Sequence, residues 1–415
     1  MRKIAISALI LILTACSSKA PSAFTKVDKV PTVFPDYTNI TVPCNIAPMN
    51  FLIDQEADRY LTVLESESGK VSIKGKKVCI PRSKWQALTR SPQITVSVYT
   101  RNKGQWSAYS PFSINVSDEI DPFISYRIIM PSVECYERLS INERDLTSFS
   151  EKVIYSNEMV QVTDKGQCIN CHHYRNYGTD NMQFHARQYM GGTIMSVDGQ
   201  LRKINLKTDS TISAGVYPAW HPTHDYIAYS TNKTHQSIHS IDPNRVEVAD
   251  EESDLILYDI RNNSVSVIEN DSAEFECFPA WSPDGRMLYY VSAHYIAPFD
   301  SKRKEQIFLD SREIRYDLYC KPFDPDTRTW GKPVLLFEPS ESERSATLPR
   351  VSPDGKLLMF SMAPYGVFHI WHRESDLWVL NLEDGSIWKP EGLNSPEVES
   401  YHSWSSDGKW VIFST

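Results

Sequence analysis

The sequence predicts a mainly β protein, with a small β-sandwich in its N-terminal part and a β-propeller in its C-terminal half. Two observations support this prediction. Short apolar and polar runs alternate over residues 36–118, and a strand-turn-strand motif recurs four times after residue 216. The 415 residues suffice for two or three domains, and a hydrophobic content of 41% suits ordinary cores.

Residues 1–15 have the features of a lipoprotein signal peptide. Two basic residues precede the apolar run Ile4–Leu13, which is too short to span a bilayer but suits the core of an export signal. The tetrapeptide that ends at Cys16 (LTAC) resembles a bacterial lipobox, in which the cysteine becomes acylated and anchors the protein to a membrane. A plain signal peptide cut near Ala15 is the alternative. Ser17, by resemblance to characterised lipoproteins, favours the outer membrane with the protein facing the periplasm.

Residues 16–35 are polar and contain three prolines, so we expect a tether without fixed structure. The next segment, 36–118, contains strand-like runs such as Gln93–Tyr99 and Phe112–Val116, which predict the sandwich. The run Trp106–Phe112 is similar to the final strands of fibronectin type III domains. This resemblance implies an immunoglobulin or fibronectin type III-like sandwich that acts as a spacer or docking platform.

The segment 191–415 contains an internal repeat. Its four copies begin at Tyr217, Phe278, Leu348 and Tyr401. Three copies contain Asp-Gly, which favours a tight turn because glycine tolerates positive φ. Repeats spaced by roughly fifty to seventy residues predict propeller blades with insertions. The last copy ends soon after Trp410–Phe413, so we expect about four blades and a half, and a propeller incomplete at its C-terminus.

Segment 119–190, predicted to hold the start of the propeller, contains the pentapeptide Cys168-Ile169-Asn170-Cys171-His172. Two thiols three positions apart, followed by a histidine, are what covalent attachment of one c-type haem requires. Cys168 and Cys171 would each add to a vinyl group, and His172 would bind the iron as its proximal ligand. A zinc site and a redox-active dithiol are the alternative interpretations of this motif. The zinc site needs a second CxxC, which the sequence lacks, and the dithiol does not explain the histidine.

The second axial iron ligand is expected among residues close to the pentapeptide. His185 is our first candidate and Met182 the second. Two histidines of a later insertion could also reach the haem, namely His235 and His239. Arg175 and Arg187 could contact the haem propionates, because a guanidinium matches a carboxylate with two hydrogen bonds. An ordinary core or surface role is the alternative for each of these residues.

The remaining cysteines and the net charge limit the other possibilities. Besides the lipobox cysteine and the two cysteines of the haem motif, five cysteines remain, namely Cys44, Cys79, Cys135, Cys277 and Cys320. A Cys44–Cys79 disulfide is possible, but connectivity cannot be deduced from sequence. The net charge is -9, and loss of the two basic signal residues makes it -11. An acidic chain without a basic run is a poor candidate for binding nucleic acid.

The lipobox, the run Asn45–Phe51, the single CxxCH motif and the repeats together resemble exported, haem-bearing TolB-like propeller lipoproteins of Bacteroidetes. The resemblance covers roughly residues 190–415 for the propeller and implies six blades. We expect a membrane-anchored, non-enzymatic electron-transfer protein whose propeller docks a redox partner. A haem-based small-ligand sensor, or a scaffold in envelope biogenesis with structural haem, are the alternatives. The absence of a G-x-S-x-G motif argues against a hydrolase.

Overall fold

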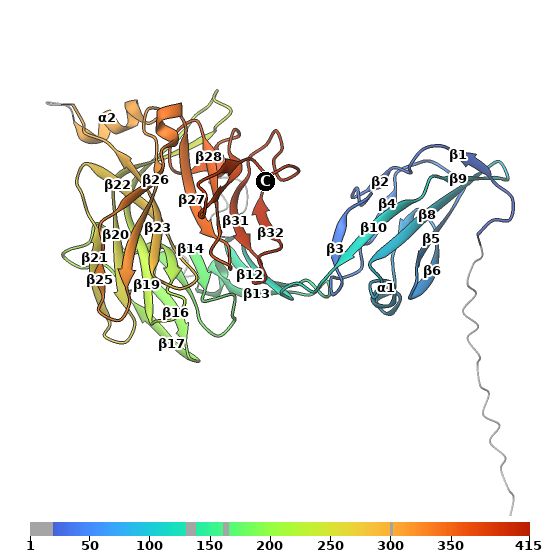
Figure 1. The fold of residues 1–415 in the computed structure, drawn as a ribbon, viewed down its shortest axis with the longest axis horizontal. Coiled ribbons are helices and arrows are strands. Elements are labelled where there is room, and N and C mark those ends of the chain that lie inside the picture. Colours follow the sequence, from blue (N-terminus) through green and yellow to red (C-terminus); the bar gives the residue numbers. More distant parts are fainter. Residues whose placement is uncertain (1–19, 130–137, 161–165, 299–301) are drawn as a thin grey trace, which may run out of the picture. The chain divides into compact units, whose positions relative to one another are not determined.

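The computed structural model describes residues 20–129, 138–160, 166–298 and 302–415, and its fold is mainly β (Figure 1). The chain divides into two compact units. The first contains residues 1–124 and 144–151, and the second contains residues 125–143 and 152–415. Within the described residues, no helix is long and apolar enough to cross a membrane.

The first unit contains two sheets. The strands of the larger sheet are β1 (Thr25–Val27), β3 (Thr41–Pro43), β5 (Arg59–Ser66), β6 (Gly69–Lys74), β8 (Gln93–Asn102), β9 (Gln105–Tyr109) and β10 (Phe112–Ser117). Their order is β1-β9-β8-β10-β3, with β5 on β8 and β6 on β5. The smaller sheet has the order β2-β4-β7. Its strands are β2 (Val33–Phe34), β4 (Phe51–Ile53) and β7 (Lys77–Val78).

One hydrophobic cluster contains residues of both sheets. Strand β8 shows why: Ile94, Val96 and Val98 are fully buried, whereas the residues between them are not. This period of two places one face of the strand in the core. Helix α1 (Arg82–Leu88), which the sequence analysis did not predict, adds the fully buried Trp85 to the same cluster.

Two expectations for this unit are corrected by the structure. The tether does not extend through residues 16–35, because β1 pairs in parallel with β9 and β2 pairs with β4. The disulfide between Cys44 and Cys79 is absent, because both thiols are free. Cys16, the expected lipid anchor, and Cys135 lie outside the described residues.

The second unit contains six successive antiparallel sheets, which we name blades 1 to 6 in chain order. Blade 1 contains β11 (Phe123–Ile128), β12 (Ser140–Asp145) and β13 (Glu151–Ser156). Blade 2 contains β14 (Gln167–Tyr174), β15 (Met182–Gln188), β16 (Gly192–Val197) and β17 (Gln200–Ile204). Blade 3 contains β18 (Val216–Trp220), β19 (Tyr226–Ile238), β20 (Val246–Asp259) and β21 (Ser264–Glu269). A parallel pairing between β20 and the first strand of the next blade, β22 (Glu274–Trp281), joins blades 3 and 4.

The other three blades complete the described part of the unit. Blade 4 contains β22 (Glu274–Trp281), β23 (Met287–His294), β24 (Asp317–Asp324), β25 (Thr329–Trp330) and β26 (Val334–Phe337). Blade 5 contains β27 (Ser345–Val351), β28 (Leu357–Ala363), β29 (Asp376–Asn381) and β30 (Ile387–Trp388). Blade 6 contains β31 (Ser400–Trp404) and β32 (Val411–Ser414), which pair with each other. The helices are α2 (Arg303–Asp310), η2 (Asn157–Val160), η3 (Pro339–Ser342) and η4 (His369–Trp371).

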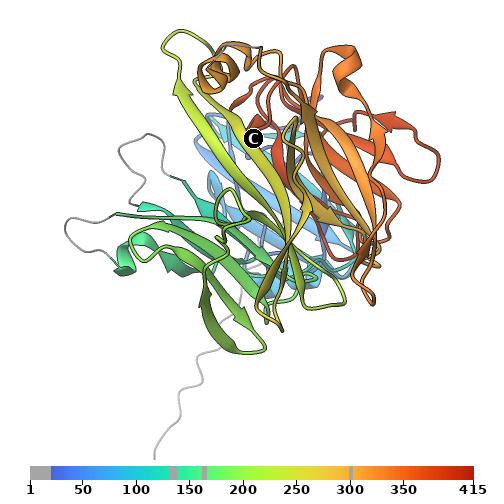
Figure 2. The same ribbon diagram turned by 90° about the vertical axis from the view of Figure 1, so that its left-hand side faces the viewer.

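The first strands of successive blades lie against one another from β14 through β18, β22 and β27 to β31. The green, yellow, orange and red sheets follow one another in chain order (Figure 2). Successive antiparallel sheets with adjoining first strands form the arrangement of propeller blades. The sequence repeat predicted about four blades and a half. It did not reveal blade 1, whose strands lack the repeat.

A serine and an aspartate close the turn after the first strand in blades 4 to 6. In blade 4, the Ser282 hydroxyl donates to the Asp284 carboxylate at 2.5 Å and accepts from the Met287 backbone N–H at 2.9 Å. Blades 5 and 6 repeat this pair with Ser352–Asp354 and Ser405–Asp407. These local contacts explain why the turns were predictable from sequence.

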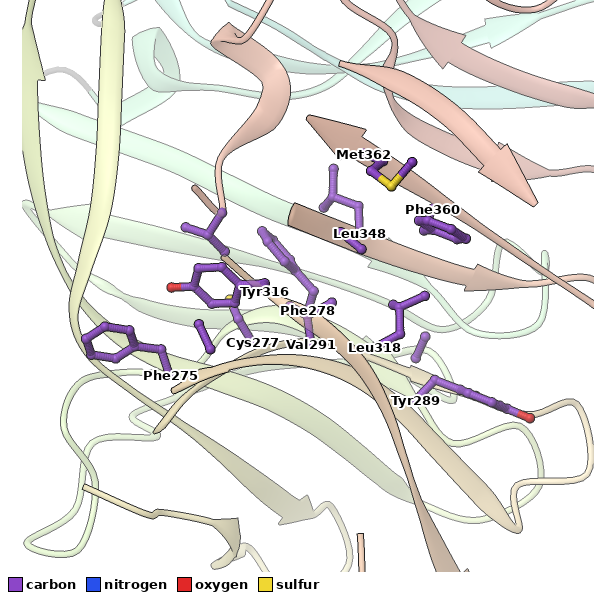
Figure 3. Packing of buried hydrophobic residues seen from close by; sticks show 14 of the residues in the cluster. Phe275, Cys277, Phe278, Tyr289, Val291, Tyr316, Leu318, Leu348, Phe360 and Met362 are labelled. Carbon is purple, nitrogen blue, oxygen red and sulfur yellow. The ribbon is translucent and has the colours of Figure 1, made fainter. Parts of the chain in front are cut away.

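The largest hydrophobic cluster packs blade 4 against blade 5 (Figure 3). Phe278 and Leu318 come from blade 4, while Leu348, Phe360 and Met362 come from blade 5, and all are nearly or fully buried. Each blade thus buries its faces against its neighbours, which fixes the positions of the first strands and of the residues they carry.

Candidate functional site

The CxxCH pentapeptide lies in β14, the first strand of blade 2. It was expected in segment 119–190, together with the start of the propeller and ahead of the repeats of 191–415. In the structure, β14 pairs with β15 on both sides of a register shift inside the motif, and β15 pairs with β16. Blade 2 therefore crosses the boundary between the predicted segments 119–190 and 191–415.

A β-bulge interrupts β14 between Asn170 and His173. The first strands of blades 3 to 6 contain a bulge at the equivalent place. One residue of each bulge has positive φ, between 49° and 55°, although none is glycine. These residues are Cys171, Tyr217, Phe278, Leu348 and Tyr401. The bulge turns the strand locally and re-aims the side chains that follow it.

Cys171 is held at this bulge by a chain of hydrogen bonds. The Gln183 side-chain amide donates to the Cys171 carbonyl at 3.0 Å, and the Tyr229 hydroxyl of blade 3 donates to the Gln183 amide oxygen at 3.1 Å. The Cys171 thiol is partly buried and free. The equivalent residues of the other blades are Tyr, Phe, Leu and Tyr, so this site has the smallest side chain of the five.

Cys168 lies three residues earlier on the same strand, and its thiol is also free and partly buried. Its Sγ accepts a hydrogen bond from the Asn170 side-chain amide at 3.2 Å. The side chain packs against the cluster between blades 1 and 2, which includes Ile169 and Phe184. The two thiols are not joined to each other, so both remain available for covalent chemistry.

The His172 imidazole faces β11 of blade 1. One ring nitrogen bonds to the Ser125 backbone, and the ring of Tyr174 lies 6.4 Å away in an edge-on arrangement. Burial lowers the pKa of His172, the hydrogen bond to Ser125 raises it, and the nearby Arg127 lowers it. The ring is therefore neutral near pH 7, and a metal-binding histidine commonly has this form, with its other nitrogen bonded to a backbone group.

The equivalent position in blade 6 also contains a histidine, His402. Its Nε2 donates to the Met359 carbonyl of blade 5 at 2.9 Å, and the side chain is 2% exposed. Blades 3 to 5 have proline here, at Pro218, Pro279 and Pro349. A histidine at this bulge can thus bond the preceding blade as a purely structural group, and this is the ordinary role against which His172 must be judged.

His185, our first candidate for the distal ligand, is buried in β15. Its Nδ1 lies 3.3 Å from the Thr193 hydroxyl, and burial followed by Arg187 lowers its pKa to about 4. Its cross-strand partner is Asn170, whereas His172 lies within the bulge, where the register of β14 and β15 shifts. A distal-ligand role for His185 therefore stays a prediction.

Met182, His235 and His239, the other candidates for the distal ligand, also stay predictions. Met182 is the cross-strand partner of Tyr174 and packs with Phe184, alongside the strand of His172. His235 lies against Phe308 of α2, with ring centroids 5.5 Å apart. His239 lies near the tip of the β19–β20 hairpin, where its N–H donates to the Arg245 carbonyl.

The two arginines expected at the propionates are placed differently. Arg175 bonds to Asp225 at 3.0 Å and to the His224 carbonyl at 3.1 Å, which commits its guanidinium to blade 3. Arg187 is exposed at the end of β15. The structure corrects Arg175 to a residue that links blade 2 to blade 3.

Two other arginines, which the sequence analysis missed, lie close to the motif. Arg127 of β11 donates to the Ile169 carbonyl at 3.2 Å and to the Asn170 side chain. Arg350 of β27 lies near His173, whose pKa falls to about 3 through burial and then through this arginine. No sequence signal marks either one, because they come from blades 1 and 5.

The residues of β14 fit a covalently attached haem in three respects. Both thiols are free, the adjacent His172 is neutral and oriented by a backbone group, and Arg127 and Arg350 have no carboxylate partner among the described residues. Within those residues, no group of three or more His, Cys, Asp or Glu side chains could hold a metal ion without such a cofactor.

No family model and no curated protein matches the chain. Solved structures show distant similarity to β-propeller proteins. The tricorn protease is 10% identical over 78% of this chain and 31% of its own, with a TM-score of 0.38. An oligogalacturonate lyase in complex with manganese is 12% identical over 78% and 83%, with a TM-score of 0.31. A Synechocystis apocarotenoid oxygenase is 10% identical over 93% and 86%, with a TM-score of 0.35.

This chain spans about a third of the tricorn protease chain. Similarity as distant as this supports no conclusion about what the chain binds or does. The propeller-like architecture of this chain follows from its own strand pairings.

Proposed function

We propose that this chain is an exported c-type haem protein that transfers single electrons, with its propeller-like unit docking a redox partner. The observation that carries the proposal is the CxxCH motif on β14, where Cys168 and Cys171 are free and His172 is neutral and oriented by Ser125. A haem attached there would supply one-electron redox chemistry. The thiols would hold it covalently, and His172 would bind its iron.

A second function is binding of a small ligand at the iron. His185 contacts the Thr193 hydroxyl, and Met182 packs with Phe184. If neither binds the iron, His172 is its one protein ligand, and the open position suits a sensor of small molecules. In the third alternative, an interaction scaffold, the haem would be structural.

Optical spectra separate the first two functions. The full chain, produced in the periplasm with haem-attachment machinery, is measured oxidised, reduced, and reduced with carbon monoxide. Electron transfer predicts a six-coordinate spectrum that carbon monoxide leaves unchanged. A clear shift on adding carbon monoxide would instead establish the small-ligand function.

We also propose attachment to the outer membrane through an acylated Cys16. Cys16→Ser should move the protein from the membrane fraction to the soluble periplasmic fraction and leave haem attachment intact, because the two sites are separate segments. Membrane association that persists in this variant would contradict the anchor without affecting the haem proposal.

A further inference from the structure

The hairpin of blade 3 is longer than that of the next blade. Its strands β19 and β20 contain 13 and 14 residues, whereas β22 and β23 of blade 4 contain 8 each. A β-bulge interrupts the pairing of β19 with β20, because Lys233 pairs with Glu252 and Thr234 pairs with Asp250. We call residues 234–250, which lie beyond this bulge, the strap. A bulge bends a strand pair, so the strap leaves its blade at a defined point.

The end of the strap contacts the β28–β29 connection of blade 5. The Asn244 side-chain amide donates to the Glu374 carboxylate at 3.1 Å, and its oxygen accepts from the Arg373 backbone N–H at 3.0 Å. The His372 Nε2 lies 3.0 Å from the Glu247 carboxylate, and both side chains are buried. Polar contacts therefore hold this end in place. A buried ion pair adds little net stability, because the loss of hydration offsets its attraction.

Asp250 lies at the bulge, and its side chain is 2% exposed. The Asn232 side-chain amide donates to its Oδ1 at 2.8 Å, and the Tyr316 hydroxyl of blade 4 donates to its Oδ2 at 2.9 Å. Among the described residues, no lysine, arginine or histidine pairs with this carboxylate. Burial raises the pKa of Asp250 to about 6, and the two hydrogen bonds offset only part of this effect. Near pH 7 an unpaired charge is thus enclosed at the base of the strap, which is costly.

The other ionisable groups around Asp250 supply no opposite charge. Three of them stay neutral near pH 7, because burial raises the pKa of each: Tyr217, Cys277 and Tyr316. The charged groups of the neighbouring elements pair with other residues: Lys233 with Glu252, Lys304 with Glu251, Arg312 with Asp242 and His372 with Glu247. Opening of the strap, which exposes Asp250 to water, relieves the cost of its charge.

We propose that the strap is a pH-sensitive device, which is closed on blade 5 at low pH and opens at the bulge when Asp250 loses its proton to solvent. In the open state the carboxyl is hydrated and has its ordinary pKa of 3.8. The closed state holds the proton more tightly, so it is favoured at low pH and loses this advantage as pH rises through about 6. The device requires no haem, so it goes beyond the proposed function.

Hydrogen exchange of the full chain, followed by mass spectrometry from pH 5 to pH 8, measures the opening. Each rate is corrected for the intrinsic effect of pH on exchange. The strap should exchange faster than β22 and β23, because it opens without unfolding its blade. Its protection should fall by roughly tenfold between pH 5 and pH 8, as the shift of one carboxyl requires. Strand β8 of the first unit should show no such fall.

Substitutions identify the group responsible. Asp250→Asn should remove the pH dependence, because an amide does not titrate. The Asn232 Oδ1 is buried without a partner, so this amide can turn to accept from the new one. Tyr316→Phe removes one hydrogen bond to the carboxylate and should increase exchange of the strap at pH 8, which tests the device even if Asp250→Asn fails to fold. Glu252→Gln, at the exposed neighbouring acid that pairs with Lys233, is the matched control and should keep the wild-type dependence.

Protection of the strap that stays constant from pH 5 to pH 8 would overturn this inference. So would a pH dependence that persists in Asp250→Asn. Greater opening at low pH would overturn it as well, because the pair of Glu247 and His372 would then control the strap. All of these results are obtained equally with the haem-free Cys168→Ser/Cys171→Ser variant, so none depends on the haem.

Discussion

The first strand of blade 2 and those of blades 3 and 4 share one backbone but differ in chemistry. Each has a bulge with a residue of positive φ, at Cys171, Tyr217 and Phe278. After that residue, blades 3 and 4 continue with Pro-Ala-Trp, whereas blade 2 continues with His-His-Tyr. The bulge therefore forms without thiols or imidazoles. The backbone of this bulge gives no reason for the two cysteines of β14, and this supports the function proposed for them.

The largest loss of stability is expected at the aromatic residue that lies three positions after the bulge residue, which in blade 4 is Trp281. Trp281 of blade 4 is 8% exposed, packs on Phe323 and Trp330, and donates from Nε1 to the Ala219 carbonyl at 3.1 Å. Trp281→Ala should lower the free energy of unfolding by about 3–5 kcal/mol. Chemical denaturation measures this loss.

The matched change in blade 2 is Tyr174→Phe, which removes one hydroxyl bonded to Ser125 at 3.3 Å. It should cost less than about 1 kcal/mol. Equal losses in the two blades would break the comparison, because blade 2 would then depend on its motif residues for stability as much as blade 4 does.

The second effect is a dependence of stability on pH. Glu276 of blade 4 is buried and occupies the position that Ile169 has in blade 2. Burial, and then Asp254 and Glu269, raise the pKa of Glu276 to about 8. The folded state therefore keeps a proton that the unfolded state has lost, so stability falls as pH rises from about 4.5 towards 8.

Glu276→Gln should remove this loss and stabilise the protein relative to wild type by roughly 2–4 kcal/mol above pH 8, with little difference below pH 4. Thermal or chemical unfolding across pH measures the difference. A constant gap between variant and wild type at all pH values would show that the carboxyl does not titrate as described.

The third effect separates the two bulge histidines. His402→Gln should cost about 1–2 kcal/mol, because it disrupts the hydrogen bond to the Met359 carbonyl, and should leave the haem spectrum unchanged. His172→Gln should instead alter the haem spectrum. If His172→Gln leaves the spectrum of the haem protein unaltered, its histidine is structural, like His402.

The smallest effect is expected at the chain that supports Cys171. Tyr229→Phe removes the hydroxyl that bonds Gln183 and should cost about 0.5–1.5 kcal/mol. Haem attachment should persist, because Gln183 still donates to the Cys171 carbonyl. Loss of attachment in this variant would mean that the position of the bulge controls the reaction of the thiols.

The sequence predicted the repeated turns because their determinants are local. Ser282 and Asp284 bond within one turn, and the same spacing recurs in blades 5 and 6. The position of the CxxCH motif was also encoded locally, since Cys171 aligns with Tyr217 and Tyr401. Blade 2 lacks both the Asp-Gly turn of blades 4 to 6 and the Pro-Ala-Trp run of blades 3 and 4, and this concealed the alignment.

The rest of the site depends on contacts between distant parts of the chain. Arg127 of blade 1 bonds to the Ile169 carbonyl and Arg350 of blade 5 lies near His173, and no spacing in the sequence marks either contact. Strand register also decides which face a residue occupies. It pairs His185 with Asn170, the residue just before the bulge that contains Cys171 and His172.

The central claim is that Cys168 and Cys171 attach one haem covalently. The most direct test is haem-dependent peroxidase staining on a denaturing gel, with the mass of the intact protein, after periplasmic production with attachment machinery. Wild type should stain and carry the mass of one haem. The Cys168→Ser/Cys171→Ser variant should do neither and yet unfold at an unchanged denaturant concentration. A folded wild-type protein that never stains would contradict the account.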